Sequence, residues 1–312
     1  MSIMSGAVPE SLDESVYVNV AQLVGLNRAA SLLSLSSSRV LARQSGDYHS
    51  PFKGRGMEFD ESRLYQAGDD VRSINWKITA RTGKPHTKLF REERERPMFV
   101  WVDLRAPMFF ATRGRYKSVI AARLAGLVAW SALHHGDRVG GVIFSEQSHH
   151  ELKPSRGKSS VLRLINHIAG HAAWRSTNHA VQDERSGAKA LIRLRRVVRP
   201  GSLIFLLSDF RNLDDTALVQ ISRMSRHNEV VLIFIYDRLE SMLPAPGRYR
   251  VSNGASEILL DTHDRNLSQS YRQRFIEHQN RLNKLAQANG IRLMGCSTED
   301  DPVTVLQTRF GK

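Results

Sequence analysis

The chain has 312 residues, 41% of them hydrophobic and only 10 of them proline, a composition typical of a folded protein and not of an extended disordered chain. Its single cysteine, Cys296, excludes an internal disulfide and a cysteine-based zinc cluster. The 45 Lys and Arg residues outnumber the 31 Asp and Glu residues, and the resulting net charge of +14 favours weak association with polyanions.

The sequence predicts neither a membrane span nor a signal peptide. No stretch approaches the roughly 20 consecutive apolar residues that a spanning helix needs. The first residues carry acids early and lack a basic flank before an apolar core. We therefore expect a cytoplasmic protein.

Three segments are predicted along the chain. Residues 1–43 are expected to be a mostly helical N-terminal segment, because Val20–Leu41 contains no proline and one glycine. Residues 44–96 form a second segment that begins with turns and short extended pieces, interrupted at Gly46, Pro51, Gly54 and Gly56. Residues 97–312 form a third segment, a domain in which strands and helices alternate.

The third segment has the pattern of an α/β protein. Its predicted strands are Met98–Asp103, Arg138–Phe144, Ser202–Ser208, Glu229–Tyr236, Glu257–Asp261 and Ile291–Gly295. Its predicted helices are Gly114–His135, Ser159–Ala169, Gly187–Val198, Asp214–Arg226 and Asp264–Asn289. Such alternation indicates βαβ units, and therefore a doubly wound, mostly parallel sheet with helices on both faces.

Two aspartates end predicted strands of this domain. Asp103 is the last residue of the first strand, and Asp209 directly follows Ser202–Ser208. In doubly wound sheets the ligand crevice lies beyond the carboxyl ends of the strands, where the strand order reverses. Asp103 and Asp209 are therefore candidates for a functional site.

The segment Gly54–Glu93 resembles the signature of a bacterial family called domain of unknown function 58. Its sequence is GRGMEFDESRLYQAGDDVRSINWKITARTGKPHTKLFREE. The residues that match the signature are Gly54, Gly56, Glu58, Phe59, Arg63, Tyr65, Gly68, Asp69, Asp70, Arg72, Ile74, Trp76, Thr79, Ala80 and Arg81. The downstream stretches HGDRVGGVIFSE, LLSDF and YDRLESMLPAPGRYRV also resemble the family, so the resemblance covers nearly the whole chain from about residue 40.

The resemblance implies a fold similar to a von Willebrand factor A domain after the signature segment. It also implies a partnership with AAA+ ATPases of the MoxR type, whose systems are thought to remodel or mature other proteins. It implies no established catalytic activity.

Von Willebrand A-type domains often carry a metal-ion-dependent adhesion site. That site begins with Asp-x-Ser-x-Ser after the first strand and adds a Thr and a later Asp, oxygen ligands that suit Mg²⁺. Aligned on Asp103, the chain has Arg105 and Pro107 where the serines belong, Asp209 fits the last position, and Thr177 corresponds only by rough placement.

We expect this metal site to be degenerate, because Arg105 and Pro107 supply no oxygen ligand. The guanidinium of Arg105 is expected to pair with Asp103 or Asp209 in place of the ion, since its planar fork matches a carboxylate. On this hypothesis the chain needs no cofactor. Binding of Mg²⁺ at the same positions is the alternative.

Charged and aromatic residues alternate within the signature segment. One interpretation is a packed subdomain whose ion pairs fix it against the sheet, with Ile74 and Trp76 as anchors. The other is a docking surface for the ATPase or its client, because aromatics and Arg are common interface hot spots. The candidate docking residues are Arg63, Tyr65, Asp69, Asp70, Arg72, Trp76 and Arg81.

Other chemistries find little support in the residues. The stretch LKPSRGKSS has Leu152 where a phosphate-binding loop requires Gly, and is predicted to begin a solvated basic helix. The adjacent pairs His134–His135 and His149–His150 lack the i, i+4 spacing of a zinc helix. Ser208 follows a strand, but no base is identifiable for it, so we expect no catalytic residue.

These observations predict a non-enzymatic protein-interaction module with a degenerate metal-ion-dependent adhesion site. It would act with a MoxR-type AAA+ ATPase, as adaptor or co-chaperone in the maturation of an unidentified client protein. The alternatives are a Mg²⁺-dependent von Willebrand A-type binding protein, a basic nucleic-acid-associated protein and a cryptic hydrolase. The basic helix residues Arg193, Arg195, Arg196 and Arg199 lack aromatic stacking partners, so we expect no nucleic-acid partner.

Overall fold

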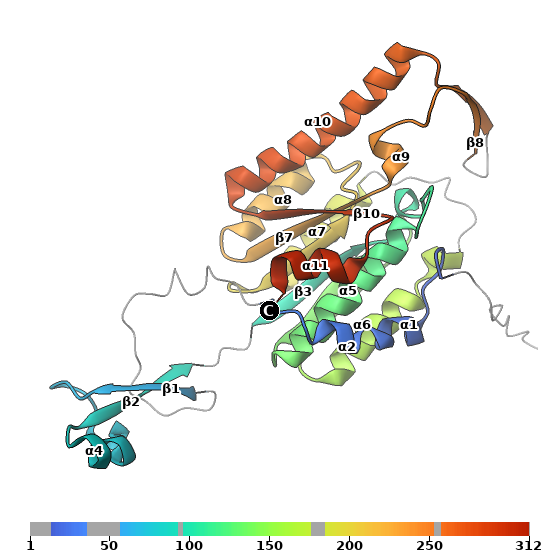
Figure 1. Ribbon diagram of the computed structural model, residues 1–312. Coiled ribbons are helices and arrows are strands. Elements are labelled where there is room, and N and C mark those ends of the chain that lie inside the picture. Colours follow the sequence, from blue (N-terminus) through green and yellow to red (C-terminus); the bar gives the residue numbers. More distant parts are fainter. Residues whose placement is uncertain (1–13, 36–56, 93–95, 176–184, 253–256, 312) are drawn as a thin grey trace, which may run out of the picture. The chain divides into compact units, whose positions relative to one another are not determined.

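The computed structural model describes residues 14–35, 57–92, 96–175, 185–252 and 257–311 (Figure 1). The chain divides into two compact units. One unit combines Met1–Leu35 with Arg96–Lys312, and we call it the α/β unit; the other is Ser36–Glu95, and we call it the small unit.

A six-stranded sheet forms the centre of the α/β unit. Its strands are β3 (Pro97–Asp103), β4 (Arg138–Phe144), β5 (His149–Ser155), β6 (Leu203–Ser208), β7 (Glu229–Tyr236) and β10 (Arg292–Ser297). They lie in the order β10-β7-β6-β3-β4-β5, and every neighbouring pair is parallel except β4 and β5. The predicted fold class, a doubly wound and mostly parallel sheet, is confirmed.

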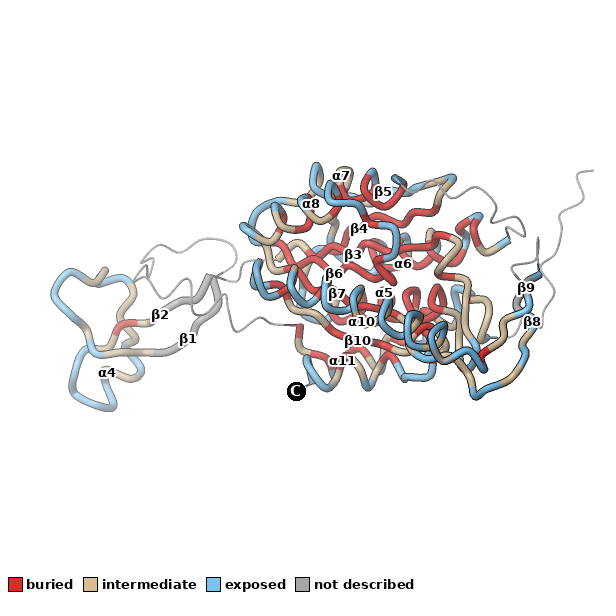
Figure 2. Tube along the Cα trace, turned by 90° about the horizontal axis from the view of Figure 1, so that it is seen from above, coloured by how far each residue is buried: buried red, intermediate tan, exposed pale blue. Residues whose placement is uncertain are grey.

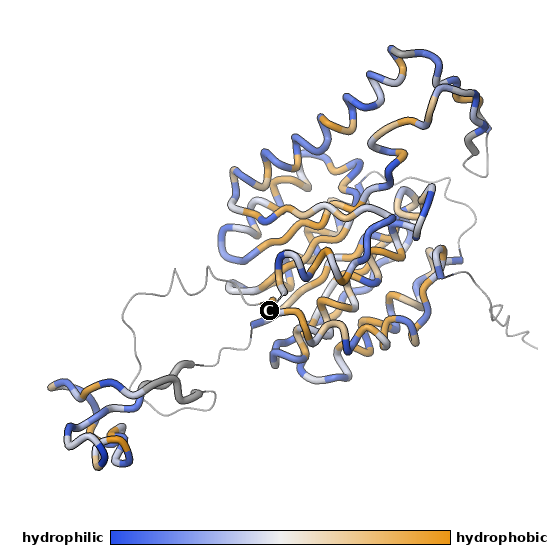
Figure 3. Tube along the Cα trace, viewed as in Figure 1, coloured by the Kyte–Doolittle hydropathy of each residue, from blue (hydrophilic) through white to orange (hydrophobic). Residues whose placement is uncertain are grey.

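Helices cover both faces of this sheet. On one side, α5 (Lys117–His134), α6 (Lys158–Ala169) and α11 (Pro302–Phe310) share an apolar cluster with Val100 and Val102 of β3. On the other, α7 (Ser186–Val197), α8 (Asp215–Ser225) and α10 (Arg265–Asn289) share a second cluster with Phe99 and Trp101. Successive strand residues point to opposite faces, so a strand buried on both sides is apolar throughout. The central strands β3, β6 and β7 are accordingly buried and hydrophobic (Figures 2 and 3).

The N-terminal residues pack on this unit and do not form one long helix. In the described part of the segment expected to be mostly helical, α1 (Val20–Gly25) and α2 (Asn27–Ala30) are helical and are followed by non-helical chain. The chain leaves the helix because Leu33 is fully buried and forms a β-bridge with Gly311. Residues 14–35 thus belong to the same compact unit as the sheet, whereas the sequence predicts a separate segment over residues 1–43.

Two further strands differ from the sequence-based expectation. Strand β5, absent from the prediction, pairs antiparallel with β4 at the edge of the sheet, where its polar residues face solvent. Strand β9 (Glu257–Asp261) is present as predicted, but it pairs with β8 (Arg248–Ser252) in a separate two-stranded sheet. The remaining elements of the unit are η2 (Ala106–Met108), η3 (Ala172–Arg175) and α9 (Arg238–Ser241).

The small unit is built on one antiparallel pair of strands. Strand β1 (Met57–Leu64) pairs with β2 (His86–Glu92), with Met57 opposite Glu92 and Leu64 opposite His86. The connection between the strands contains η1 (Val71–Ser73) and α4 (Trp76–Thr82). Gly83 ends α4 in the left-handed conformation, with φ of 69°, which glycine adopts without strain.

Candidate functional site at the carboxyl edge of the sheet

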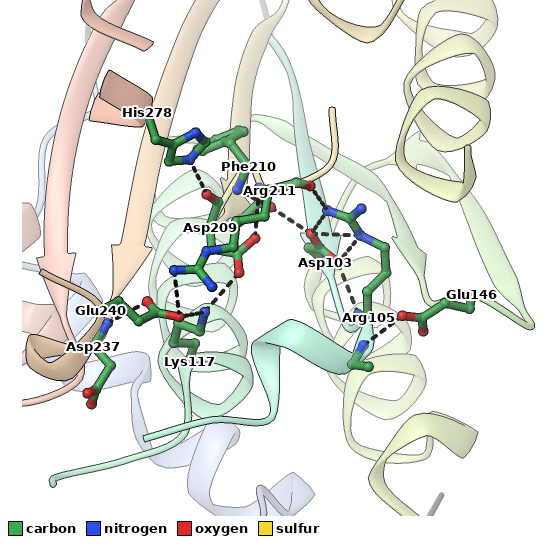
Figure 4. Close-up of polar contacts among 12 residues, drawn as sticks. Asp103, Arg105, Lys117, Glu146, Asp209, Phe210, Arg211, Asp237, Glu240 and His278 are labelled. Carbon is green, nitrogen blue, oxygen red and sulfur yellow. Dashed lines mark hydrogen bonds and ion pairs between the residues drawn. The ribbon is translucent and has the colours of Figure 1, made fainter. Parts of the chain in front are cut away.

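The strand order of the sheet reverses beside β3. The chain runs from β3 to β4 and β5 on one side, then returns to β6 on the other side of β3. Asp103 is the last residue of β3, and Asp209 follows the last residue of β6. The structure therefore brings the two predicted aspartates to the switch point, where ligands of such folds bind (Figure 4).

The carboxylate of Asp103 is occupied by the side chain of Arg105. Nε of Arg105 donates to both oxygens at 3.0 and 3.1 Å, and Nη2 donates to Oδ2 at 2.7 Å. The backbone N–H of Arg105 adds a bond of 3.0 Å to Oδ1, and Ser208 Oγ donates to Oδ2 at 2.6 Å. The ion pair that the sequence predicts between Arg105 and Asp103 is therefore present, and its carboxylate accepts five hydrogen bonds.

The guanidinium of Arg105 is itself enclosed by the fold. Only 3% of the residue is exposed, and Nη2 also donates to the carbonyl of Arg211 at 3.2 Å. Burial alone would lower the pKa of Arg105, but the adjacent Asp103 carboxylate, with Asp209 and Glu146, outweighs burial and raises it, so the group stays charged. A Cβ at Gly187 of α7 would lie 3.4 Å from Nη1 and 2.6 Å from Leu213, so this glycine leaves the room that the guanidinium needs.

A second buried cation, Lys117, neutralises Asp209. Lys117 Nζ lies 2.8 Å from Asp209 Oδ2 and 2.7 Å from Glu240 Oε1, and its side chain is 0% exposed. Burial raises the pKa of Asp209, but the ammonium of Lys117, the Arg211 N–H and the charge of Arg105 together outweigh burial and lower it below its ordinary value. Arg211 reaches the same Glu240 oxygen at 3.4 Å from the solvent side.

The helix that carries Glu240 is fixed by Asp237. Asp237 and Glu240 form a capping box at the start of α9, in which Asp237 N–H donates to Glu240 Oε2 at 2.9 Å. Thr112 and Thr298 donate from their hydroxyls to Asp237 at 2.6 and 2.7 Å. Burial raises the pKa of Asp237, but these hydrogen bonds outweigh burial and lower it. Glu240 is thereby held in place beside Lys117.

The loop after β6 adopts a strained backbone. Phe210 and Asn212 have φ of 54° and 55°, a conformation that costs a non-glycine residue about 1–3 kcal/mol. Phe210 N–H donates to Ser208 Oγ at 2.8 Å, and His278 Nε2 donates to the carbonyl of Asp209 at 2.9 Å. The loop is therefore held from three sides: by β6, by α10 and by Arg105.

The predicted site residues are only partly gathered. Asp103, Arg105 and Asp209 lie together, while Pro107 lies within η2 and contacts neither carboxylate by hydrogen bond or ion pair. Thr177 lies outside the described residues. Sequence reasoning missed Lys117 and Glu240.

A signal for Lys117 was nevertheless present in the sequence. Lys117 stands three and seven residues before Ile120 and Leu124, on the stripe of the helix that faces the core. A lysine on such a stripe must have buried partners.

The predicted docking residues all lie in the small unit. Arg63 and Asp69 form an ion pair at 2.7 Å, and Asp70 caps η1 by accepting from Arg72 N–H at 2.9 Å. Asp69 also accepts a hydrogen bond from Gln66 N–H. This hydrogen bond and the nearby charge of Arg63 lower the pKa of Asp69, although burial acts in the opposite direction. Trp76 is 67% exposed, so it is not packed within the small unit, and its expected role as an anchor against the sheet stays a prediction. Tyr65 and Arg81 form no ion pair with the described residues.

Two serines could be considered as nucleophiles, and neither has a base. Ser208 donates to Asp103, so its proton is directed at a carboxylate that Arg105 already neutralises. Ser148 Oγ lies 3.1 Å from Nε2 of His171, in the lining of a small pocket of about 120 Å³. Ala173 N–H donates to Nδ1 of His171, so the neutral ring carries its proton on Nε2 and donates to Ser148. A histidine in that tautomer cannot take the serine proton.

The described ranges of the chain contain neither a metal-binding cluster nor a membrane-spanning helix. No group of three or more His, Cys, Asp or Glu side chains there could hold a metal ion. Among the same residues, none of the helices combines the length and apolar character needed to cross a membrane. Burial raises the pKa of Cys296 to about 12, so its thiol is not poised to react.

Comparisons with solved structures give low similarity. An aerotolerance-related membrane protein from Bacteroides fragilis has 14% identity, a TM-score of 0.43, and coverage of 68% of this chain and 94% of its own. The conserved hypothetical protein BatB from Bacteroides thetaiotaomicron has 12% identity and a TM-score of 0.35, covering 67% of this chain and 92% of its own. The fold of this chain is established by its own strand order.

Comparisons of sequence identify relatives and a family. Uncharacterized proteins of Mycobacterium bovis (Mb1516) and Mycobacterium tuberculosis (Rv1480) are 28% identical over 215 residues, which is 69% of this chain and 66% of each relative. The match thus spans slightly less than two thirds of these relatives. A family model described as protein of unknown function DUF58 matches residues 61–281, more than half of the chain. The chain therefore belongs to the DUF58 family.

Proposed function

We propose that the chain is a cytoplasmic, non-enzymatic protein-interaction module of the von Willebrand A type with a degenerate metal site. It acts with a MoxR-type AAA+ ATPase as adaptor or co-chaperone in the maturation of a client protein. The observation that carries the proposal is the occupation of both switch-point carboxylates by side-chain cations: Arg105 lies on Asp103, and Lys117 lies on Asp209.

These side chains do not fit a bound Mg²⁺. A hard divalent cation prefers oxygen ligands in octahedral array. Here an ammonium nitrogen lies 2.8 Å from Asp209 and a guanidinium nitrogen 2.7 Å from Asp103, so an added ion would meet two positive charges. The module would then hold its partner without the bridging metal of a metal-ion-dependent adhesion site.

The serine geometry also supports a role without catalysis. Ser208 has no base, and the pairing of Ser148 with His171 runs in the direction opposite to nucleophile activation. Family membership adds no activity, since the family model describes a protein of unknown function.

The test is complex formation with a MoxR-type ATPase from the same organism. The tagged chain is used to capture the purified ATPase under two conditions. The first contains ATP and Mg²⁺. The second contains EDTA and a non-hydrolysed nucleotide that binds the ATPase without metal. We expect equal capture in both. The ATPase must be shown to stay assembled in EDTA, by its elution volume. Loss of capture in EDTA with the ATPase assembled contradicts the degenerate site, and no capture in either condition contradicts the partnership.

A further inference from the structure

The small unit presents a distinct tip, which we define as residues 64–85. The β1–β2 ladder begins with Met57 opposite Glu92, where the chain enters and leaves, and ends with Leu64 opposite His86. The tip is the connection beyond that last pair, and it contains η1 and α4. It therefore lies at the end of the ladder away from the entry and exit of the chain.

Hydrogen bonds hold the tip together where an apolar core would be expected. Asp69 accepts from Arg63, from Gln66 N–H and from Thr87, at 2.7, 2.9 and 3.3 Å. Asn75 caps α4 and donates to Ser62 Oγ at 2.9 Å. Among the described side chains of the small unit only Thr87 is buried, as the tan and pale blue trace around α4 shows (Figure 2). A unit with so little buried surface is marginal by itself.

The tip instead exposes its large apolar side chains. Trp76 is 67% exposed, Val71 59% and Leu64 53%. Single exposed apolar residues are ordinary, but three within residues 64–85, one of them a tryptophan, indicate an interaction site. Tryptophan is the residue type most enriched at interface hot spots.

Cations without ion-pair partners among the described residues lie close to these apolar residues in the sequence. Residues 62–88 inclusive contain six Lys and Arg residues and two Asp residues, and one of those Asp residues is paired with Arg63. Four exposed cations have no ion-pair partner among the described residues: Arg72, Lys77, Arg81 and Lys84. The tip therefore combines an aromatic anchor with excess positive charge.

We propose that the tip docks into an acidic, partly apolar surface of a protein partner, with Trp76 as its buried anchor. This inference rests on the proposed function of an interaction module and names the surface it uses. A second copy of the chain fits poorly, because like tips would bring the same cations together and each chain has a net charge of +14. Acidic groups on the partner would complement Arg72, Lys77, Arg81 and Lys84, while an apolar pocket would take the indole.

The experiment measures binding of fluorescein-labelled peptides to the full chain by anisotropy. The main probe has four repeats of Glu-Glu-Leu-Asp. One control replaces every acid by its amide, and a second replaces every Leu by Ser. We expect the first peptide to bind most tightly, Trp76→Ala to weaken it about tenfold, and Trp76→Phe to retain most of the affinity.

Matched variants separate the tip from general charge and exposure. Leu259→Ala removes another exposed apolar side chain, and Arg196→Glu reverses an exposed charge, both in the α/β unit. Neither variant is expected to change the affinity for the acidic peptide by more than about twofold. The double variant Lys77→Glu, Arg81→Glu is expected to lower that affinity about tenfold or more. The proposal is overturned if the Trp76→Ala variant binds the acidic peptide as tightly as the intact chain does, or if the intact chain does not bind that peptide.

Two outcomes distinguish this inference from its alternatives. If single-stranded DNA of similar charge displaces the peptide, and if binding of that DNA is also lost in Trp76→Ala, the tip binds nucleic acid and the protein-partner proposal is wrong. If the ATPase complex forms and is unchanged by Trp76→Ala and by the double charge reversal, the tip is not the docking surface, yet the proposed function stands. If that complex never forms while the acidic peptide binds through Trp76, the ATPase partnership fails and the docking surface stands.

Discussion

The switch point of the sheet and the tip of the small unit contain the same kinds of charged residue in opposite states. At the switch point, Arg105 and Lys117 are buried and each contacts a carboxylate within 3 Å. At the tip, Lys77 and Arg81 are exposed and contact no carboxylate of the described residues. The difference separates charges that serve the fold from charges that remain available to a partner.

The comparison also extends to tryptophan. Trp130 of α5 is 1% exposed and donates from Nε1 to the carbonyl of Leu23 at 2.9 Å, so it fastens the N-terminal residues to the α/β unit. Trp76 at the tip is 67% exposed. A residue at the switch point should therefore matter for stability and little for partner affinity, and a residue at the tip should show the reverse.

The largest expected effect follows from removing Lys117. Lys117→Met leaves Asp209 and Glu240 buried without their cation, and we expect the free energy of unfolding to fall by about 3–5 kcal/mol. Urea unfolding followed by circular dichroism measures the loss. Arg196→Met, at an exposed position, is the control and should change stability by less than about 0.5 kcal/mol.

A compensating variant sharpens this prediction. Adding Asp209→Asn and Glu240→Gln to Lys117→Met removes the uncompensated charges, so part of the lost stability should return. If Lys117→Met alone costs less than about 1 kcal/mol, the buried pair does not stabilise the fold and the distinction from the tip is lost.

The next effect concerns the pH dependence of the α/β unit. His171 is 2% exposed, and burial, with lesser contributions from His150 and His167, lowers its pKa to about 4 from an unfolded value of 6.5. The folded protein resists protonation of this ring, so stability is complete above pH 6.5 and falls as the pH drops toward 4. The loss amounts to about 3 kcal/mol.

Urea unfolding at pH 7.0, 5.5 and 4.5 measures this loss. The variant His171→Asn can still accept from Ala173 N–H, and it should flatten the decline in that window because the titrating group is gone. An unchanged slope in the variant would assign the decline to other groups. Asp209 also has a lowered pKa, so its contribution is lost at still lower pH.

A third prediction concerns the ion that the switch point does not suit. Replacing Arg105 and Pro107 by Ser and Lys117 by Ala recreates Asp-x-Ser-x-Ser and frees both carboxylates. Mg²⁺ should then raise the melting temperature of the triple variant by a few degrees, because a ligand that binds the folded state stabilises it. The unaltered chain should show no such shift. A Mg²⁺-dependent shift in the unaltered chain would instead favour the metal-dependent alternative.

The fold could be predicted from the sequence largely because its strands are buried on both faces. β3, β6 and β7 are almost continuous runs of apolar residues, which bound the helices between them. Strand β5 escaped prediction because an edge strand faces solvent, and its sequence HHELKPS has no apolar pattern. The end of α2 could not be predicted, because the β-bridge of Leu33 with Gly311 that follows it joins residues distant in the sequence.

The site could be predicted only as far as its strand ends. Asp103 and Asp209 lie at the ends of apolar strands. Arg105 stands where the Asp-x-Ser-x-Ser motif has its first serine, and this difference indicated that Arg105 pairs with a carboxylate. Lys117 and Glu240 could not be placed beside Asp209, because they come from separate elements that only the tertiary fold brings together. A lysine at a helix start is ordinarily exposed, and only its position on the apolar stripe distinguished Lys117.

The smallest expected effect on stability is that of Trp76→Ala. Because the side chain is 67% exposed, the variant should change the free energy of unfolding by less than about 0.5 kcal/mol. Trp130→Ala, which removes a buried indole, should cost about 3–5 kcal/mol. Urea unfolding of both variants gives the comparison directly. A large loss in Trp76→Ala would mean that the indole supports the small unit internally, and its weaker peptide binding would then reflect unfolding of the tip. Unchanged stability together with weakened binding would assign the indole to the partner, because the tip would be intact and only its contact removed.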